Sequence, residues 1–124
     1  MKYMLLIYEN EAEWDALTET EQRAEMGEYL RFTDDIRRTG NHLSQVPTAP
    51  LAPTTTSTTV RVRNGKTMLT DGPFAETKEQ LGGFYIVEAA NVDEAIALAA
   101  RLPGARWGSV EVRPFNLDER GRER

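Results

Sequence analysis

Hydrophobic runs of strand length recur along the chain and are separated by polar or turn-forming stretches. Residues 3–8 and 83–88 are apolar almost throughout, which predicts strands that are covered on both faces. Residues 41–46 and 109–113 are predicted as two further strands. The pattern therefore predicts a sheet that draws strands from both ends of the chain.

A hairpin is predicted in the middle of the chain. Residues 58–63 alternate apolar and polar positions, residues 66–70 return, and the Asn-Gly pair at 64–65 is the strongest short hairpin signal. The hairpin is expected to end at Asp71. Residues 47–53, which precede it, contain three prolines and so must leave the sheet as a surface loop, either a lid or a rigid connection.

Two helices are predicted from caps and periodicity. Thr18 and Glu21 match a capping box, in which each side chain accepts a hydrogen bond from the backbone N–H of the other. Gly40 supplies a left-handed residue to end this helix. Asn91 can cap a second helix, and the Pro-Gly pair at 103–104 is expected to stop it. The apolar face of the first helix is predicted to carry Met26, Tyr29, Leu30, Thr33 and Ile36.

The order of these elements is strand, helix, strands with a hairpin, strand, helix, strand. This is the ferredoxin-like split βαβ order with an added hairpin, so we predict an α+β fold with an antiparallel sheet and two helices on one face. The opposite face would be bare in a monomer, although residues 3–8 and 84–87 are apolar on both sides. We therefore expect a homodimer in which a second copy covers that face.

The composition restricts the class of protein and its partners but does not indicate a reaction. The chain has 124 residues, 40% hydrophobic and 28% charged, which predicts one globular domain at residues 1–114 with a polar tail at 115–124. A net charge of −5 argues against nucleic acid and anionic membranes as partners. With no cysteine and one histidine, we predict no metal and no cofactor. Without a signal segment or membrane span, the cytoplasm is the default location.

The most distinctive chemistry lies in residues 70–84. Asp71 precedes Gly72 and Pro73, so the chain is expected to bend in an ordered turn that presents one carboxylate. Asp71 is either a general base acting on a bound substrate or an Asx-turn residue that caps backbone N–H groups.

Three segments together resemble the YCII-related family, in its DGPF-domain branch: residues 1–8, 71–79 and 81–84. The resemblance covers residues 1–114 and implies a dimeric α+β barrel with a cleft at the sheet surface. It also implies that Asp71 stands at the aspartate position of a His–Asp pair, with Tyr29 at the histidine position, so the proton relay of the family does not carry over. Members of this branch are often encoded beside extracytoplasmic-function sigma factors, which implies an accessory role in transcriptional regulation.

Other side chains are candidates for a small-molecule site beside Asp71. His42 is the only imidazole and titrates near neutral pH if it lines the cleft. Tyr29 is more typical of a core residue, with a hydroxyl that needs a partner if buried. The residues predicted to bind a ligand are Tyr29, His42, Gly72, Pro73, Phe74 and Lys78. Two function classes stay open, an enzyme with Asp71 as its catalytic residue and a non-catalytic binding or regulatory protein.

Overall fold

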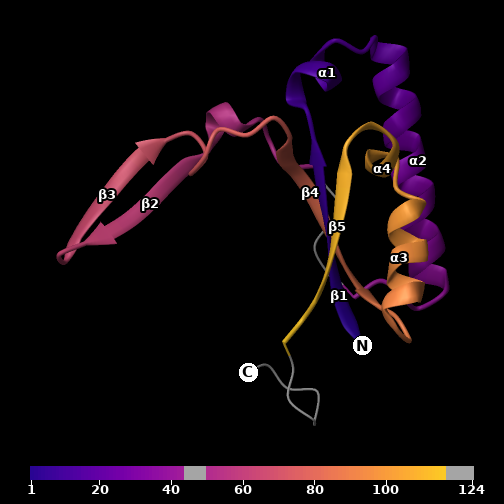
Figure 1. Ribbon diagram of the computed structural model, residues 1–124. Coiled ribbons are helices and arrows are strands. Elements are labelled where there is room, and N and C mark those ends of the chain that lie inside the picture. Colours follow the sequence, from indigo (N-terminus) through magenta and orange to yellow (C-terminus); the bar gives the residue numbers. More distant parts are fainter. Residues whose placement is uncertain (44–49, 117–124) are drawn as a thin grey trace.

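The central strand of the molecule, β1 (Lys2–Glu9), pairs antiparallel with a neighbour along each edge. β4 (Gln80–Glu88) lies on one side and β5 (Ser109–Pro114) on the other, which gives the order β4-β1-β5 (Figure 1). At the middle of this sheet, Leu5 is opposite Tyr85 in one ladder and Val112 in the other. Because side chains alternate along a strand, β1 sends Leu5 and its alternate neighbours to one face and the residues between them to the other.

The computed structural model describes residues 1–43 and 50–116. The last part of the predicted strand at 41–46 and most of the predicted tail at 115–124 lie outside the described residues. The elements outside the three-stranded sheet are α1 (Glu11–Asp15), α2 (Glu19–Arg38), the 3-10 turn η1 (Thr54–Thr56), β2 (Thr58–Arg63), β3 (Lys66–Asp71), α3 (Val92–Ala100) and α4 (Gly104–Trp107).

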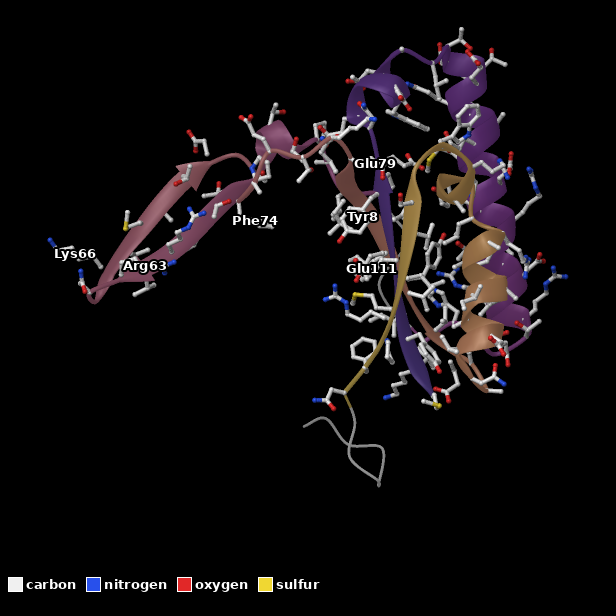
Figure 2. All side chains as sticks on the ribbon, in the orientation of Figure 1. Tyr8, Arg63, Lys66, Phe74, Glu79 and Glu111 are labelled. Atoms are coloured by element: carbon white, nitrogen blue, oxygen red, sulfur yellow. The ribbon has the colours of Figure 1, made fainter. Side chains whose placement is uncertain are left out.

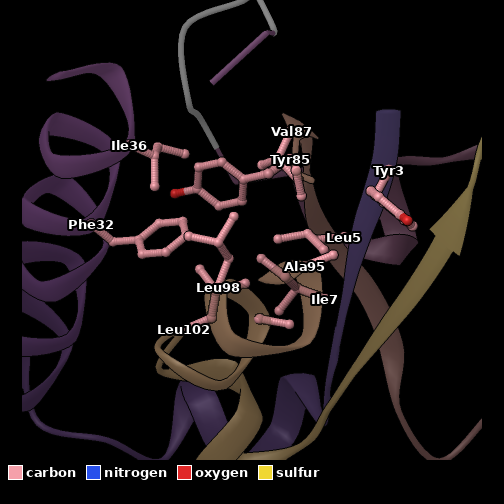
Figure 3. Packing of buried hydrophobic residues seen from close by; sticks show 12 residues of the cluster. Tyr3, Leu5, Ile7, Phe32, Ile36, Tyr85, Val87, Ala95, Leu98 and Leu102 are labelled. Atoms are coloured by element: carbon pink, nitrogen blue, oxygen red, sulfur yellow. The ribbon is translucent and has the colours of Figure 1, made fainter. Parts of the chain in front are cut away.

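The hydrophobic core lies between one face of this sheet and the helices α2 and α3 (Figures 1 and 3). Phe32 of α2 meets Tyr85 of β4 edge to face, with ring centroids 5.2 Å apart. The Tyr85 hydroxyl would be costly to bury alone, and it shares a 2.9 Å hydrogen bond with the hydroxyl of Thr33. The buried hydrophobic residues are Tyr3, Leu5, Ile7, Phe32, Ile36, Tyr85, Val87, Ala89, Ala95, Leu98, Ala99 and Leu102.

Local capping signals are confirmed at both long helices. The Thr18 hydroxyl accepts from the N–H of Glu21 at 3.1 Å, and the Glu21 carboxylate accepts from the N–H of Thr18 at 3.0 Å. Gly40 has a φ of 80°, the left-handed conformation expected after the helix. Asn91 accepts from the N–H of Glu94 at 3.0 Å.

The helix predictions need two corrections. Pro103 and Gly104 do not simply stop the second helix, because α3 ends at Ala100 and the short helix α4 starts at Gly104. Leu30, predicted on the apolar face of α2, is 59% exposed. The three-stranded sheet is too narrow to cover the whole predicted apolar face of α2. Leu30 lies at the margin of that face and stays in solvent.

The strand predicted at residues 41–46 is reduced, in the part that the structure describes, to a bridge between His42 and Val87. The N–H of Leu43 donates to the carbonyl of Ile86 at 3.0 Å, and the N–H of Glu88 donates to the carbonyl of Asn41 at 2.7 Å. This segment therefore occupies the outer edge of β4, where a ferredoxin-like fold has its second strand.

The hairpin β2–β3 forms as predicted but stands apart from the body of the molecule (Figure 1). Asn64 and Gly65 have φ values of 52° and 73°, as the turn requires. Val60 and Leu69 are cross-strand partners and are 59% and 68% exposed. The described hairpin therefore has an uncovered apolar surface.

The face of the three-stranded sheet opposite the helices is also uncovered. Leu6 and Phe84 are partners on this face, and Phe84 is 39% exposed. Tyr8 and Glu111 also lie on this face, on the side of the sheet away from the helices (Figure 2). The architecture is thus the predicted α+β, ferredoxin-like arrangement.

Within the described residues, no helix is both long and apolar enough to cross a membrane.

Gly72→Ala is expected to loosen the base of the hairpin. Gly72 has a φ of 98°, and its N–H donates to the Ser57 carbonyl at 2.8 Å, so an alanine must adopt a disfavoured conformation to keep this bond. The free energy of opening the hairpin should fall by about 1 kcal/mol, measured as faster amide exchange in β2 and β3. Gly83→Ala is the control, because Gly83 has no positive φ and a Cβ there meets nothing within 4 Å. Equal exchange rates in the two variants would contradict the prediction.

Candidate functional site

A cavity of about 240 Å³ opens where β1 ends and β4 begins, beside α1 and α2. The segment around Pro50 and Pro53 forms another wall, so residues distant in the chain enclose it. The described lining residues are Ile7, Glu9, Glu11, Trp14, Asp15, Met26, Tyr29, Pro50, Leu51, Pro53, Gln80, Gly82, Gly83, Phe84 and Tyr85. Most of them are apolar or aromatic, and the polar groups gather at few points.

The polar end of the cavity is built around the hydroxyl of Tyr29. This hydroxyl donates to Glu9 Oε1 at 3.1 Å and accepts from the backbone N–H of Gly104 at 3.0 Å. A Cβ at Gly104 would lie 2.6 Å from Ile7 Cγ2 and 2.9 Å from both oxygens of the Tyr29–Glu9 hydrogen bond. Glycine is therefore required at position 104 for α4 to approach this pair so closely.

The pKa values of both members of this pair are raised. Burial raises the pKa of Glu9 above its ordinary value, the Tyr29 hydrogen bond lowers it, and the Glu79 carboxylate raises it again. The pKa of Tyr29 is raised, by burial first and then by the charge of Glu9. Tyr29 is consequently a neutral phenol that donates its proton to Glu9 throughout the physiological range.

Glu25 lies one turn before Tyr29 on the same face of α2. It is only 7% exposed, and its Oε1 atom has no hydrogen-bond partner among the described residues. Burial, followed by the charge of Glu9, raises the pKa of Glu25 to about 7, against a smaller lowering by Arg106. Arg106 does not pair with Glu25, because its guanidinium binds Glu28 Oε2 at 2.7 Å. Glu25 is thus a buried carboxyl group that titrates near neutral pH.

The wall of the cavity is held in place by Glu11. Its carboxylate accepts from the N–H of Thr54 at 2.9 Å and from the Thr54 hydroxyl at 2.8 Å. The N–H of Glu11 donates to Gln80 Oε1 at 3.0 Å, and the N–H of Leu51 donates to the Gly82 carbonyl at 2.8 Å. These bonds join α1, the segment before β2 and β4, so the cavity is largely preformed.

Among the residues predicted from sequence for the site, Tyr29 lines this cavity. His42 lies at the sheet edge against Tyr85, with ring centroids 6.1 Å apart, and its pKa is lowered by burial and then by the charge of Arg37. Asp71 is exposed at the end of β3. The segment that follows it is mostly exposed and does not line the cavity; it contains Gly72, Pro73, Phe74 and Lys78. Among the described residues, Phe74 is the most exposed large hydrophobic side chain, at 80%.

The sequence analysis missed the carboxylates of the cavity and the short helix α1. Glu9 ends an apolar strand and therefore looked like a solvent boundary. Glu25, beside the cavity, was not among the predicted site residues, although its four-residue spacing to Tyr29 places both on one face of α2. Asn10 was a usable signal for α1, because its side chain accepts from the N–H of Ala12 at 2.9 Å.

Fold and cavity together define a small α+β protein with a ferredoxin-like sheet and a pocket at the end of its central strand. Residues 1–116 match the YCII-related domain, so the chain belongs to the YCII-related family. An uncharacterised protein of Rhizobium meliloti (strain 1021) is 40% identical over 124 residues, which cover 98% of this chain and 97% of the relative. The family therefore extends over the sheet, the helices and the hairpin alike.

Glu25→Gln is expected to stabilise the protein at pH 8 but not at pH 5. The pKa of Glu25 is about 7 in the folded state and near the ordinary 4.5 when unfolded, so wild-type stability falls as pH rises from about 4.5 through 7. Above that window the folded state carries a buried charge that glutamine lacks. The gain at pH 8 should be about 1 kcal/mol, because solvent and Arg106 screen the charge.

Thermal unfolding of both proteins across this pH range measures the difference. Glu76→Gln is the matched control, since Glu76 is exposed and its loss of charge should shift stability equally at both pH values. Parallel stability curves for wild type and Glu25→Gln would show that Glu25 is already solvated in the folded state.

Proposed function

We propose that this YCII-related protein binds a small organic molecule in the cavity where β1 ends and β4 begins. The observation that carries the proposal is a preformed cavity of about 240 Å³ with apolar walls and one polar end at Glu9 and Tyr29. Small-molecule sites are typically such concave apolar pockets, with a few polar groups that fix orientation. The volume suits a ligand somewhat smaller than a typical drug.

A homodimer is the second part of the proposal. Leu6 and Phe84 form an apolar strip on the sheet face opposite the helices, and Val60 and Leu69 expose a second apolar strip on the hairpin. A contiguous apolar sheet face is costly in water, and a second copy that presents the same face can cover it. The DGPF-branch resemblance, which implies a dimeric barrel, agrees with this arrangement.

We propose two alternatives for the bound molecule, which is either turned over with Asp71 as the catalytic residue or bound without turnover in a regulatory role. Asp71 is exposed and lies outside the cavity lining, so a role in chemistry needs a ligand bound at the hairpin base rather than in the cavity. If the protein is instead a non-catalytic accessory protein, including one associated with sigma factors, the cavity binds its ligand without turning it over. A ligand screen that measures both binding and turnover separates these alternatives. A compound that is turned over supports the enzyme, and compounds that bind without turnover support the accessory protein.

Tyr29→Phe is expected to weaken ligand binding about tenfold, because it removes the hydroxyl that joins Glu9 to the backbone of Gly104. A fragment library screened by protein NMR against wild type supplies the ligands, and titration supplies the affinities. Tyr8→Phe is the control, since Tyr8 lies on the open sheet face outside the cavity. Unchanged affinities in Tyr29→Phe would contradict the assignment of the polar end. A compound that wild type turns over and Asp71→Asn does not would support the catalytic role of Asp71.

Light scattering at micromolar concentration should give about twice the 14.0 kDa mass of one chain. Leu6→Glu should reduce the mass to one chain, because it places a charge in the centre of the proposed interface. Ile96→Glu introduces the same charge at a half-exposed position of α3 on the helical side and should leave the dimer intact. Wild type at the mass of one chain would overturn the dimer.

A further inference from the structure

We propose that the cavity is specific for an organic cation, a protonated amine on an apolar or aromatic body, with the ammonium group at Glu9. This inference rests on the proposed binding function and adds the chemical class of the ligand. The charge and the wall composition of the cavity point to it independently, and a buried carboxyl group near Glu9 adds to the negative charge.

The charges of the lining all have one sign. Three carboxylates line the cavity, from Glu9, Glu11 and Asp15, and no Lys, Arg or His is present among the lining residues that the structure describes. The nearby Arg106 is held outside by its 2.7 Å ion pair with Glu28. A cavity with carboxylates and low-dielectric walls concentrates a negative potential, which attracts a cation and repels an anion.

The aromatic residues in the walls of the cavity also favour a cation. Trp14, Tyr29, Phe84 and Tyr85 all contribute to the lining. Aromatic faces attract an ammonium group through their quadrupoles, and more strongly when the group is desolvated. The same rings bury an apolar ligand body, so one molecule with both parts matches the whole cavity.

A buried carboxyl group close to the polar end lacks a hydrogen-bond partner among the described residues. Glu25, which is not itself a lining residue, is more than nine-tenths buried, its Oε1 atom has no partner among the described residues, and the charge of Glu9 disfavours its ionised form. An unpartnered buried carboxyl oxygen is costly, and a cation bound at Glu9 would offset the repulsion between the two groups.

A metal ion fits this site poorly. Within residues 1–43 and 50–116, no group of three or more His, Cys, Asp or Glu side chains is placed to hold one. The walls offer rings and methyl groups where a metal ion would need further oxygen or nitrogen ligands. An ammonium group needs fewer donors and gains from the rings, so the cation is organic.

The test compares benzylamine, benzyl alcohol and benzoate, which share a ring and differ in charge. Trp14 lines the cavity and Trp107 is 62% exposed on α4, so the two indole N–H signals report binding and its control in one NMR titration. Benzylamine should shift the Trp14 signal and bind at least about tenfold more tightly than benzyl alcohol. Benzoate should not bind at the same concentrations.

Three variants locate the charge that confers the preference. Glu9→Gln should weaken benzylamine binding about tenfold and leave benzyl alcohol unchanged. Glu25→Gln, which leaves Glu9 in place, should weaken benzylamine about threefold and keeps the test usable if Glu9→Gln does not fold. Glu13→Gln removes an equal charge from an exposed position of the same helix as Glu11 and should change neither affinity.

The outcomes separate this inference from the function on which it rests. Equal binding of amine and alcohol, or tighter binding of benzoate, overturns the cation preference while the cavity keeps its binding role. An amine preference that survives both Glu9→Gln and Glu25→Gln also overturns it. If no compound of the fragment screen, charged or neutral, shifts the Trp14 signal, the proposed binding function itself fails.

Discussion

The pairing of β1 on both of its edges is the constraint from which the rest of the structure follows. Its inward residues Tyr3, Leu5 and Ile7 form the sheet side of the core, and its outward residue Leu6 lies on the open face. Its last residue, Glu9, becomes the polar end of the cavity. Because side chains alternate with a period of two, a one-residue shift of register would exchange the core and the open face.

The acidic end of the cavity is a place where the fold gives up stability. Glu9 and Glu25 are carboxyl groups held near each other and partly or largely out of water, and burial raises the pKa of each. The Tyr29 hydroxyl and the Gly104 N–H compensate Glu9 only in part. Groups with perturbed ionisation in a cavity are typical of functional sites, and Glu9 is such a group.

The hairpin presents the opposite situation, apolar surface without a cavity. A two-stranded hairpin is at best marginally stable alone in water, yet β2–β3 exposes Val60, Val62 and Leu69. Its tip carries the basic residues Arg63 and Lys66, whereas Glu111 on the open sheet face is already paired with Arg113 (Figure 2). A second copy would supply contacts that one chain lacks, which joins the hairpin to the proposed dimer.

The sequence by itself determined the elements whose signals are local. The capping box at Thr18, the cap at Asn91 and the Asn-Gly turn at 64–65 were predictable because each depends on hydrogen bonds or backbone conformations within a few residues. The order of these elements also fixed the ferredoxin-like class. The site was decided by tertiary structure, because Tyr29 meets Glu9 across 20 residues and Gly104 across 75. No local pattern reports such contacts, and charged residues such as Glu25 are expected in water until a neighbouring element covers them.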